Sequence, residues 1–521
     1  MTRRETLHGV GAASFSAIAG GLLTGLAGQG VNRAHAAIGA VTPFDQNSVM
    51  QLARDLSATP YRPAAITLPP RLKQLSYDDY RAIRFRTEQA IWRGKGHKFE
   101  LQLFPMGWLY NKPVRLWLVD GDQAKELLPD GQLFDFGKLK DNPPNADEFG
   151  FAGFRVHGPI NRADYFDEYL VFQGASYFRA VARGQTYGLS ARGLALDTAE
   201  PGGEEFPVFR TFWIEQPAKG DDAIRVHALL DSPSTTGAYR FDITPGDVTR
   251  CDVRATLFPR KDLKAPGLAP LTSMFLLGPN DRQGLHDFRP SVHDSEGLAI
   301  LNGKGERLWR PLNNPKTLQV SAFVDDNPRG FGLIQRDRAF TSYEDLEANY
   351  EKRPSLWVEP TGPWGRGAVH LVEIPTREEI HDNIVAFWRP EAPLKAGAPY
   401  TMSYRLHWGA DVPTSAEPSQ QGLARVVKTR VGDAWKARGT LFVIDYVGGP
   451  VQPSAQKPEA QVTTSAGAIE NVVVQPNRAT GGTRVSFEVH PPGVAMAELR
   501  ADLRVGGKPV AETWLYRWSR P

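Results

Sequence analysis

The stretch that decides the fold runs from residue 224 to residue 258. It contains IRVHALL (224–230), YRFDI (239–243) and RATLF (254–258). Apolar and polar residues alternate in these segments, as they do in a strand that buries one face. Gly, Pro, Asp and Ser fill the connections, and these are the residue types that turns favour. The stretch therefore predicts three neighbouring antiparallel strands.

The same pattern extends in both directions from this stretch. Further alternating segments lie at residues 97–104, 114–119 and 211–215, so we expect a large antiparallel β-sandwich and a mainly β chain. Few helices are expected. One should follow Ser76. A second should follow Thr341, with Glu344 completing a capping box, and end before Pro354.

The length of 521 residues predicts at least two domains. The clearest break in composition is PEAPLKAGAP at 390–399. We therefore expect a large β-sandwich domain over 37–390, a linker over 391–399 and a second domain over 400–521. About seven strand-like segments predict an immunoglobulin-like sandwich for that second domain; they include 400–408, 423–429, 440–446, 484–489 and 513–518.

The first 36 residues are typical of an export signal. Arg3 and Arg4 precede a weakly apolar run over 9–26, and Ala-His-Ala follows at 34–36. The run is rich in Gly, Ala and Ser, which disfavours the alternative of a membrane anchor. We expect a twin-arginine signal peptide over 1–36, removal after about Ala36, and a periplasmic protein.

Composition disfavours several functional classes. Removing Arg3, Arg4, Arg33 and Glu5 from 61 basic and 58 acidic residues leaves 58 and 57, so no charge excess points to nucleic acid. The lone cysteine, Cys251, is flanked by a strand-like pattern and is expected to be a buried thiol. We find no metal-ligand, Walker or dinucleotide-binding motif, and we expect no cofactor.

Four segments are dense in Arg, His, Asp and Glu, and three of them also contain aromatic residues. They lie at 153–165, 287–298, 353–365 and 378–383. Sugar rings present flat C–H faces and a rim of hydroxyl groups, so a glycan site needs aromatic platforms beside polar side chains. Each segment alone could be a loop with salt bridges and caps, but four together favour a carbohydrate cleft. The candidate substrate-binding residues are Arg155, Asp164, Tyr165, Arg289, His293, Glu296, Tyr350, Trp357 and Trp364.

From YDDYRAIRF (77–85) onward, the sequence resembles the periplasmic glucan biosynthesis proteins G and D. The most specific stretches are DEYLVFQGASYFR (167–179), YGLSARGLA (187–195) and the segments at 287–298 and 353–365. The twin-arginine signal favours the D branch. The resemblance implies a large β-sandwich followed by an immunoglobulin-like domain, and a role in making osmoregulated periplasmic glucans.

The resemblance also implies an inverting enzyme that cleaves or transglycosylates β-1,2-glucan. The family's proposed acid and base match Asp382 and Asp294. Glycosidic cleavage needs one protonated carboxyl and one ionised carboxylate, and Glu296, Glu359, Glu378 and Glu379 are rivals in the same segments. The residues before Asp382, Glu-Glu-Ile-His (378–381), differ from the D-branch pattern, so different neighbours are expected around the acid.

A non-catalytic glucan-binding or scaffold protein that assists a membrane glucan synthase is the alternative, because it needs the same cleft. The sequence leaves a monomer and a homodimer both open. Trp435 lies on a glycine-bounded polar loop (432–439) of the second domain. We expect it to reach a glucan cleft, since exposed aromatic residues mark contact surfaces; folding back on its own loop is the alternative.

Overall fold

The structure, a computed structural model, describes residues 37–64, 68–141, 143–145, 148–282, 284–414, 422–434, 439–451, 457–490 and 493–520. The expected signal peptide and Trp435 lie outside these ranges. Strands dominate, which confirms the mainly β class. The chain forms two compact units. One holds the described residues up to Pro270 with Ala392–Gly409, and the other holds Leu271–Glu391 with Ala410–Pro521.

The first unit is a sandwich of two sheets. One has the strand order β1-β5-β4-β12-β13-β14-β15-β26, and the other has the order β10-β9-β8-β7-β3. Phenylalanine rings fill the space between them: Phe172 on β8 lies 5.4 Å from Phe212 on β12 and 5.2 Å from Phe241 on β14, measured between ring centroids. The strands are β1 Ile38–Pro43, β3 Glu100–Pro105, β4 Arg115–Asp120, β5 Gln123–Leu127, β7 Phe151–Arg162, β8 Tyr165–Gln173, β9 Tyr177–Ala180, β10 Ser190–Arg192, β12 Val208–Glu215, β13 Ile224–Asp231, β14 Thr235–Thr244, β15 Val248–Pro259 and β26 Tyr400–Gly409.

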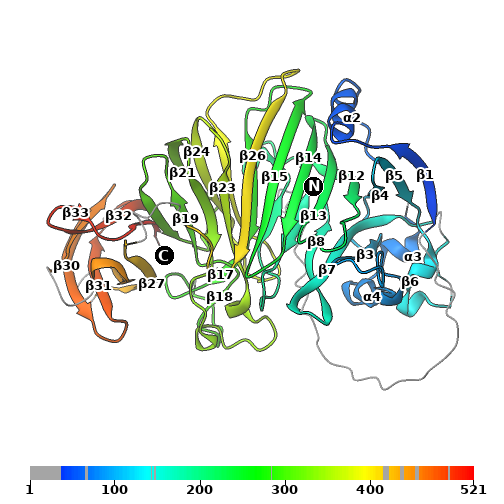
Figure 1. The fold of residues 1–521 in the computed structure, drawn as a ribbon. Coiled ribbons are helices and arrows are strands. Elements are labelled where there is room, and N and C mark those ends of the chain that lie inside the picture. The colour runs from blue at the N-terminus through cyan, green and yellow to red at the C-terminus, as the bar shows by residue number, and fades with distance from the viewer. Residues whose placement is uncertain are drawn as a thin grey trace. The chain divides into compact units, whose positions relative to one another are not determined.

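The stretch at 224–258 forms β13, β14 and β15, paired antiparallel as predicted. Figure 1 shows them as adjacent green arrows. Cys251 lies on β15 opposite Ile243 and is 1% exposed. Burial raises the pKa of this thiol well above its usual value, so the expectation of a buried, unreactive cysteine is confirmed.

One expected strand lies in a different unit from the one we predicted. Residues 400–408 were expected to begin the second domain, but β26 pairs with β15 along its whole length, from Val248 opposite Gly409 to Leu257 opposite Tyr400 (Figure 1). The preceding segment is also fixed, because Leu394 and Leu263 exchange both backbone hydrogen bonds. Strand pairing depends on partners distant in sequence, which a composition break does not reveal.

The second unit contains further sheets. One path runs β23-β22-β19-β20-β34-β32-β29, a second runs β21-β24-β25, and a four-stranded sheet has the order β27-β28-β31-β30. The strands are β19 Gly297–Leu301, β20 Arg307–Pro311, β21 Gln319–Asp326, β22 Gly330–Ile334, β23 Ser355–Pro360, β24 Arg366–Glu373, β25 Ile384–Pro390, β27 Arg425–Asp433, β28 Thr440–Val447, β29 Glu459–Thr464, β30 Ala468–Asn477, β31 Gly482–His490, β32 Met496–Val505 and β34 Thr513–Ser519.

The C-terminal strands pack as a sandwich inside this unit. Trp514 on β34 contacts Phe442 on β28 and Phe487 on β31, with ring centroids 5.6 and 5.8 Å apart. β34 also pairs parallel with β20, at Leu308 opposite Thr513 and Trp309 opposite Trp514. This pairing crosses the domain boundary expected at 391–399. The immunoglobulin-like classification stays a prediction.

Helices are short. The helix expected after Ser76 is α4, Tyr77–Ala82, and the Ser76 hydroxyl accepts a hydrogen bond from the Asp79 amide at 3.1 Å. Two further helices were not expected from the sequence: α2, Ser48–Ser57, and α3, Pro70–Lys73. None of the helices among the described residues has the length and apolar character to cross a membrane.

The helix expected over 342–353 is absent. The segment holds two short 3-10 turns instead, η5 Phe340–Ser342 and η6 Tyr350–Lys352. Glu344 and Asn349 have φ of +56° and +48°, which a right-handed helix excludes. The Asp345 carboxylate accepts hydrogen bonds from the amides of Glu347 and Ala348, so the side chain competes with helical pairing.

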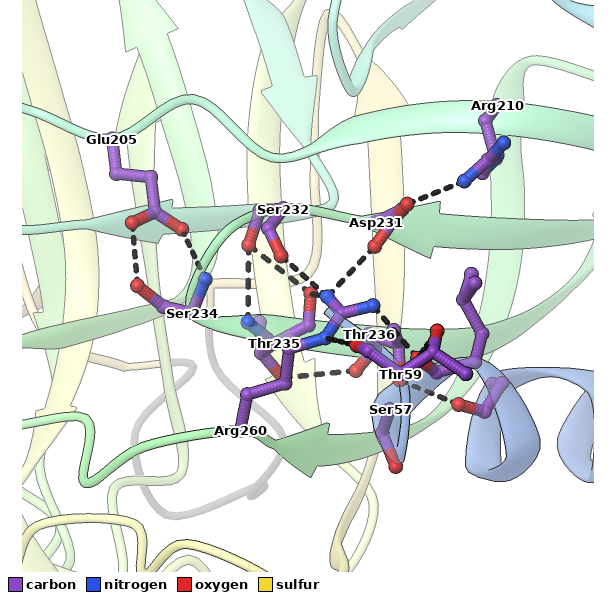
Figure 2. A network of polar contacts seen from close by, with 12 residues as sticks. Ser57, Thr59, Glu205, Arg210, Asp231, Ser232, Ser234, Thr235, Thr236 and Arg260 are labelled. Atoms are coloured by element: carbon purple, nitrogen blue, oxygen red, sulfur yellow. Dashed lines mark hydrogen bonds and ion pairs between the residues drawn. The ribbon is translucent and has the colours of Figure 1, made fainter. Parts of the chain in front are cut away.

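A buried guanidinium holds the end of α2 against the sheet of the first unit (Figure 2). Arg260 Nη1 donates to Asp231 Oδ1 at 2.8 Å, and its Nη2 donates to the Leu56 carbonyl at 2.9 Å. Asp231 also pairs with Arg210 at 2.6 Å and is 1% exposed. Arg260 thereby joins the last turn of α2 to the β13–β14 hairpin.

We expect Arg260→Met to lower the free energy of unfolding by about 1–3 kcal/mol, because it removes one of the two cations that pair with the buried Asp231 and the hydrogen bond to the Leu56 carbonyl. Urea unfolding measures this loss, and hydrogen exchange over 48–57 should accelerate. Lys261→Met, at an exposed neighbouring position, is the matched control and should change stability by under about 0.5 kcal/mol. Equal stability of the two variants would contradict the clamp.

Candidate functional site

A short ladder in the second unit positions Asp294. β17, Phe275–Leu277, pairs antiparallel with β18, Val292–His293, and Phe275 lies opposite His293. Their rings stack with centroids 5.3 Å apart and planes inclined by 7°. The Asp294 amide, just beyond β18, donates to the Met274 carbonyl at 2.9 Å. The ladder therefore fixes the backbone that carries Asp294.

The same strand also anchors the loop that carries Asp382. The next residue, Asn383, is 1% exposed; its Oδ1 accepts from the Phe275 amide at 2.8 Å and its Nδ2 donates to the Phe275 carbonyl at 3.0 Å. The Asp294 backbone and the residue after Asp382 are thus attached to two consecutive residues, Met274 and Phe275, at the start of β17. Inversion by direct activation of water requires about 6.5 to 9.5 Å between the two carboxyl groups. That separation of Asp294 and Asp382 stays a prediction.

The other end of the Asp382 loop is fixed by a second asparagine. Asn314 Oδ1 accepts from the Thr376 amide at 3.0 Å, and its Nδ2 donates to the carbonyls of Thr376 at 2.8 Å and Leu276 at 3.0 Å. Residues 376–383, which we call the Asp382 loop, are therefore anchored to β17 at both ends.

The carboxylate of Asp294 has a buried counter-ion. Asp294 and Arg353 are both 5% exposed and form an ion pair. The Arg353 guanidinium carbon lies 4.3 Å from the centre of the Tyr350 ring. Burial alone would lower the pKa of Arg353, but the charge of Asp294 raises it above its usual value. Arg353 therefore stays charged beside Asp294.

Arg289 joins three loops. Its Nη2 pairs with Asp287 at 2.8 Å, and its Nη1 pairs with Asp345 at 2.7 Å and with Glu379 at 2.7 Å. Its Nε also donates to Asp287 at 3.1 Å. Four of its five N–H groups are thus committed to carboxylates. Its main contacts are ion pairs within the protein, and the expected sugar contact of Arg289 stays a prediction.

Tyr350 and His293 are packed against these charged residues. Tyr350 is 1% exposed, and its hydroxyl donates to Glu379 Oε2 at 3.1 Å. The His293 ring contacts Tyr343, with centroids 5.3 Å apart, and its Nδ1 lies 3.0 Å from Gln335 Oε1. Burial lowers the pKa of His293 to about 4, so the ring is neutral at pH 7. Both residues are buried among these partners, and a sugar contact for either stays a prediction.

Glu296 lies two residues beyond Asp294. Its Oε2 accepts from the amides of Arg336 and Asp337 at 3.3 and 3.2 Å. Burial raises the pKa of Glu296 to about 7, although the Arg336 charge opposes this. Glu296 therefore remains a rival carboxyl group, because it titrates near neutral pH.

We expect Glu296→Gln to reduce the loss of stability as pH rises. The folded protein keeps a proton on Glu296 that the unfolded chain releases above about pH 4.5, so this group contributes stability below that pH and loses it as pH rises through about 7. The unfolding free energy of the wild type should fall by about 1–3 kcal/mol relative to the variant between pH 5 and 8. Urea unfolding of both proteins at four pH values measures this difference. If the unfolding free energies of wild type and variant changed in parallel with pH, the prediction would be refuted.

Both tryptophans expected as platforms belong to the core. Trp357 on β23 is 2% exposed and packs among the core residues shared with β28 and β34. Trp364 is 7% exposed, and its ring lies 6.5 Å from Phe331 and 6.2 Å from Trp388. Neither presents a ring face to a sugar, so packing replaces the predicted role.

Three candidates lie in the first unit. Arg155 on β7 binds Glu168 and Gln102, each at 2.7 Å. Asp164 and Tyr165 lie in the β7–β8 hairpin, where Tyr165 is 55% exposed. Asp294 and Asp382 lie in the second unit. Their sugar contacts stay predictions, as does the role of Trp435.

Arg353, Glu379 and Asn383 lie in segments singled out from the sequence, but their part in the site's framework was not expected, and Asn314 and Gln335 were not expected at all. A buried counter-ion and an asparagine clamp have no local motif. Within the described residues, no group of three or more His, Cys, Asp or Glu could hold a metal ion.

Comparison with known proteins identifies the family. Residues 44–518 match the family model described as "Periplasmic glucan biosynthesis protein, MdoG". Relatives named glucans biosynthesis protein G include those of Vibrio cholerae (54% identity over 91% of this chain and 87% of the relative), Rhodopseudomonas palustris (52%; 91% and 93%) and Bradyrhizobium diazoefficiens (49%; 100% of both).

Among solved structures, a polysaccharide lyase aligns at 11% identity and a TM-score of 0.19. The alignment covers 71% of this chain and 45% of the lyase chain. That likeness is too weak to support an argument. The sequence matches extend through both compact units and include the segments that carry Asp294 and Asp382. The chain belongs to the periplasmic glucan biosynthesis protein family.

Proposed function

We propose that this member of the family cleaves or transglycosylates β-1,2-glucan with inversion at the reacting carbon. Asp382 protonates the leaving oxygen as general acid, and Asp294 activates the attacking water or hydroxyl group as general base. The observation that carries the proposal is the shared anchor: Met274 and Phe275 of one chain segment hold the backbone beside both carboxylates.

The surroundings of the two carboxylates favour different roles. Asp294 is buried beside the charged Arg353, which suits a carboxylate that accepts a proton. Asp382 is partly exposed on a loop, where it can meet a leaving group. These environments support the assignment of base and acid.

A non-catalytic glucan-binding protein is the second candidate. It is favoured by the Asp294–Arg353 pair itself, because the guanidinium already occupies the carboxylate that would act as base. Such a protein would present the nascent polymer to a membrane glucan synthase. β-1,2-Glucan is the ligand in both proposals.

The deciding experiment incubates the purified mature protein with linear β-1,2-glucan. Chain length is followed by chromatography, and the anomeric configuration of new reducing ends is followed by NMR. Shorter chains with inverted α-ends support hydrolysis, and redistributed lengths without new reducing ends support transglycosylation. Unchanged chain length with measurable glucan binding would favour the binding protein and reject the enzyme.

The family description implies a periplasmic protein. Export by the twin-arginine route and kinship with the D branch are further parts of this proposal. They rest on Arg3 and Arg4, whereas the relatives above carry the name G. Replacing both arginines by lysine should block export by that route.

A further inference from the structure

The middle of the Asp382 loop has its own attachment, made by Glu379. The anchors at Asn314 and Asn383 hold only the ends of the loop. Between them, Glu379 Oε2 receives Arg289 Nη1 at 2.7 Å and the Tyr350 hydroxyl at 3.1 Å. Only two residues separate Glu379 from Asp382, so a shift of this carboxylate changes the path of the backbone that carries the candidate acid.

Arg289 is a rigid partner for this carboxylate. Its side chain is 13% exposed and is held by both oxygens of Asp287 and by Asp345. Hydrogen bonds with Asp287 and Asp345, and the charge of Glu379, raise the pKa of Arg289 above its usual value against the effect of burial. A guanidinium that is already held in place positions a carboxylate more precisely than a flexible cation does.

The adjacent residue Glu378 provides a natural contrast. Its side chain is 66% exposed, and its ion-pair partner is His381 at 3.5 Å, within the same loop. Glu378 therefore carries the same charge on the same loop but makes no such ion pair with the Arg289 network. A comparison of variants at Glu378 and Glu379 therefore distinguishes the effect of the loop's charge from the effect of its attachment to Arg289.

We propose that Glu379 is a positioning residue for Asp382. By pairing with Arg289 and Tyr350, it sets the conformation of the Asp382 loop in which the acid meets the leaving oxygen. This inference rests on the proposed function, since it presumes that Asp382 donates the proton. Glu379 itself neither donates nor accepts the reacting proton.

Glu379→Gln should lower kcat on β-1,2-glucan by about 10- to 100-fold and change KM by less than about threefold, because a misplaced acid weakens the transition state more than ground-state binding. Glu378→Gln, the matched control, should retain kcat within about twofold. A nitrophenyl glycoside of a β-1,2-linked gluco-oligosaccharide needs no protonation of its leaving group, so bond cleavage in Glu379→Gln should recover most of its rate on that substrate.

Hydrogen exchange gives a readout that does not depend on activity. Amides over 377–382 should exchange at least about 10-fold faster in Glu379→Gln than in Glu378→Gln, while those of β24 stay unchanged. This comparison remains informative if the wild type fails to shorten glucan, so the loop inference and the proposed function can fail separately. Unchanged exchange and normal kcat would overturn the positioning role. Lost turnover with unchanged exchange would make Glu379 the reacting carboxyl and would also overturn it.

Discussion

Asp382→Asn is expected to lower turnover of linear β-1,2-glucan by at least about 100-fold. The amide has nearly the same shape as the carboxyl group but cannot deliver a proton to the leaving oxygen, and loss of a general acid commonly costs 10²- to 10⁴-fold. Folding should be preserved, because the neighbouring anchor at Asn383 uses its own side chain. Steady-state kinetics on defined chain lengths measure the effect.

The binding control for this variant is the affinity for intact glucan, measured by calorimetry. It should stay within about threefold of the wild type, as should the midpoint of urea unfolding. A variant that unfolds would say nothing of acid catalysis, so these controls come first. Near-normal turnover in a folded Asp382→Asn variant would reject Asp382 as the acid.

Arg353→Met is expected to lower the free energy of unfolding by about 3–5 kcal/mol at pH 7. The substitution leaves the Asp294 carboxylate buried without its counter-ion, and breaking one side of a buried pair has about this cost. The double variant Arg353→Met with Asp294→Asn should recover part of the loss, because the unpaired charge is gone.

Arg366→Met is the matched control, since that arginine is 69% exposed and pairs with Glu391 at 3.4 Å. It should change stability by under about 1 kcal/mol, as expected for a surface pair. Urea unfolding at constant pH compares the variants. If Arg353→Met proved as stable as Arg366→Met, the buried pair would not support the site.

The local parts of the fold could be predicted from the sequence, because they depend on patterns within a few residues. Alternation located β13, β14 and β15, and the Ser76 cap located α4. The helix expected after Thr341 failed because Asp345 bonds to local amides and the backbone is left-handed at Asn349. A capping-box pattern does not reveal that competition.

Distant partners explain the other errors. Trp357 was expected as a sugar platform, but its indole fills the space above Gly330, where a Cβ would lie 2.3 Å from the ring. Only the pairing of β22 with β23 brings these residues together. For the site, the family resemblance supplied Asp382 and Asp294, whereas Arg353 and Asn383 became visible as partners only through contacts that span 59 and 108 residues.

The two asparagine anchors of the Asp382 loop have a consequence for how this protein can vary. Asn383 and Asn314 bond to backbone atoms of Phe275, Leu276, Ile374 and Thr376, and every residue type other than proline offers the same amide and carbonyl. Side chains in β17 can therefore change without loosening the loop, provided that both asparagines remain. Residues 377–382 can therefore be exchanged as a segment, because Asn314 and Asn383 hold the two ends of the loop. Transplanting the corresponding segment of a relative should alter the chemistry around Asp382 while the attachment points stay where they are.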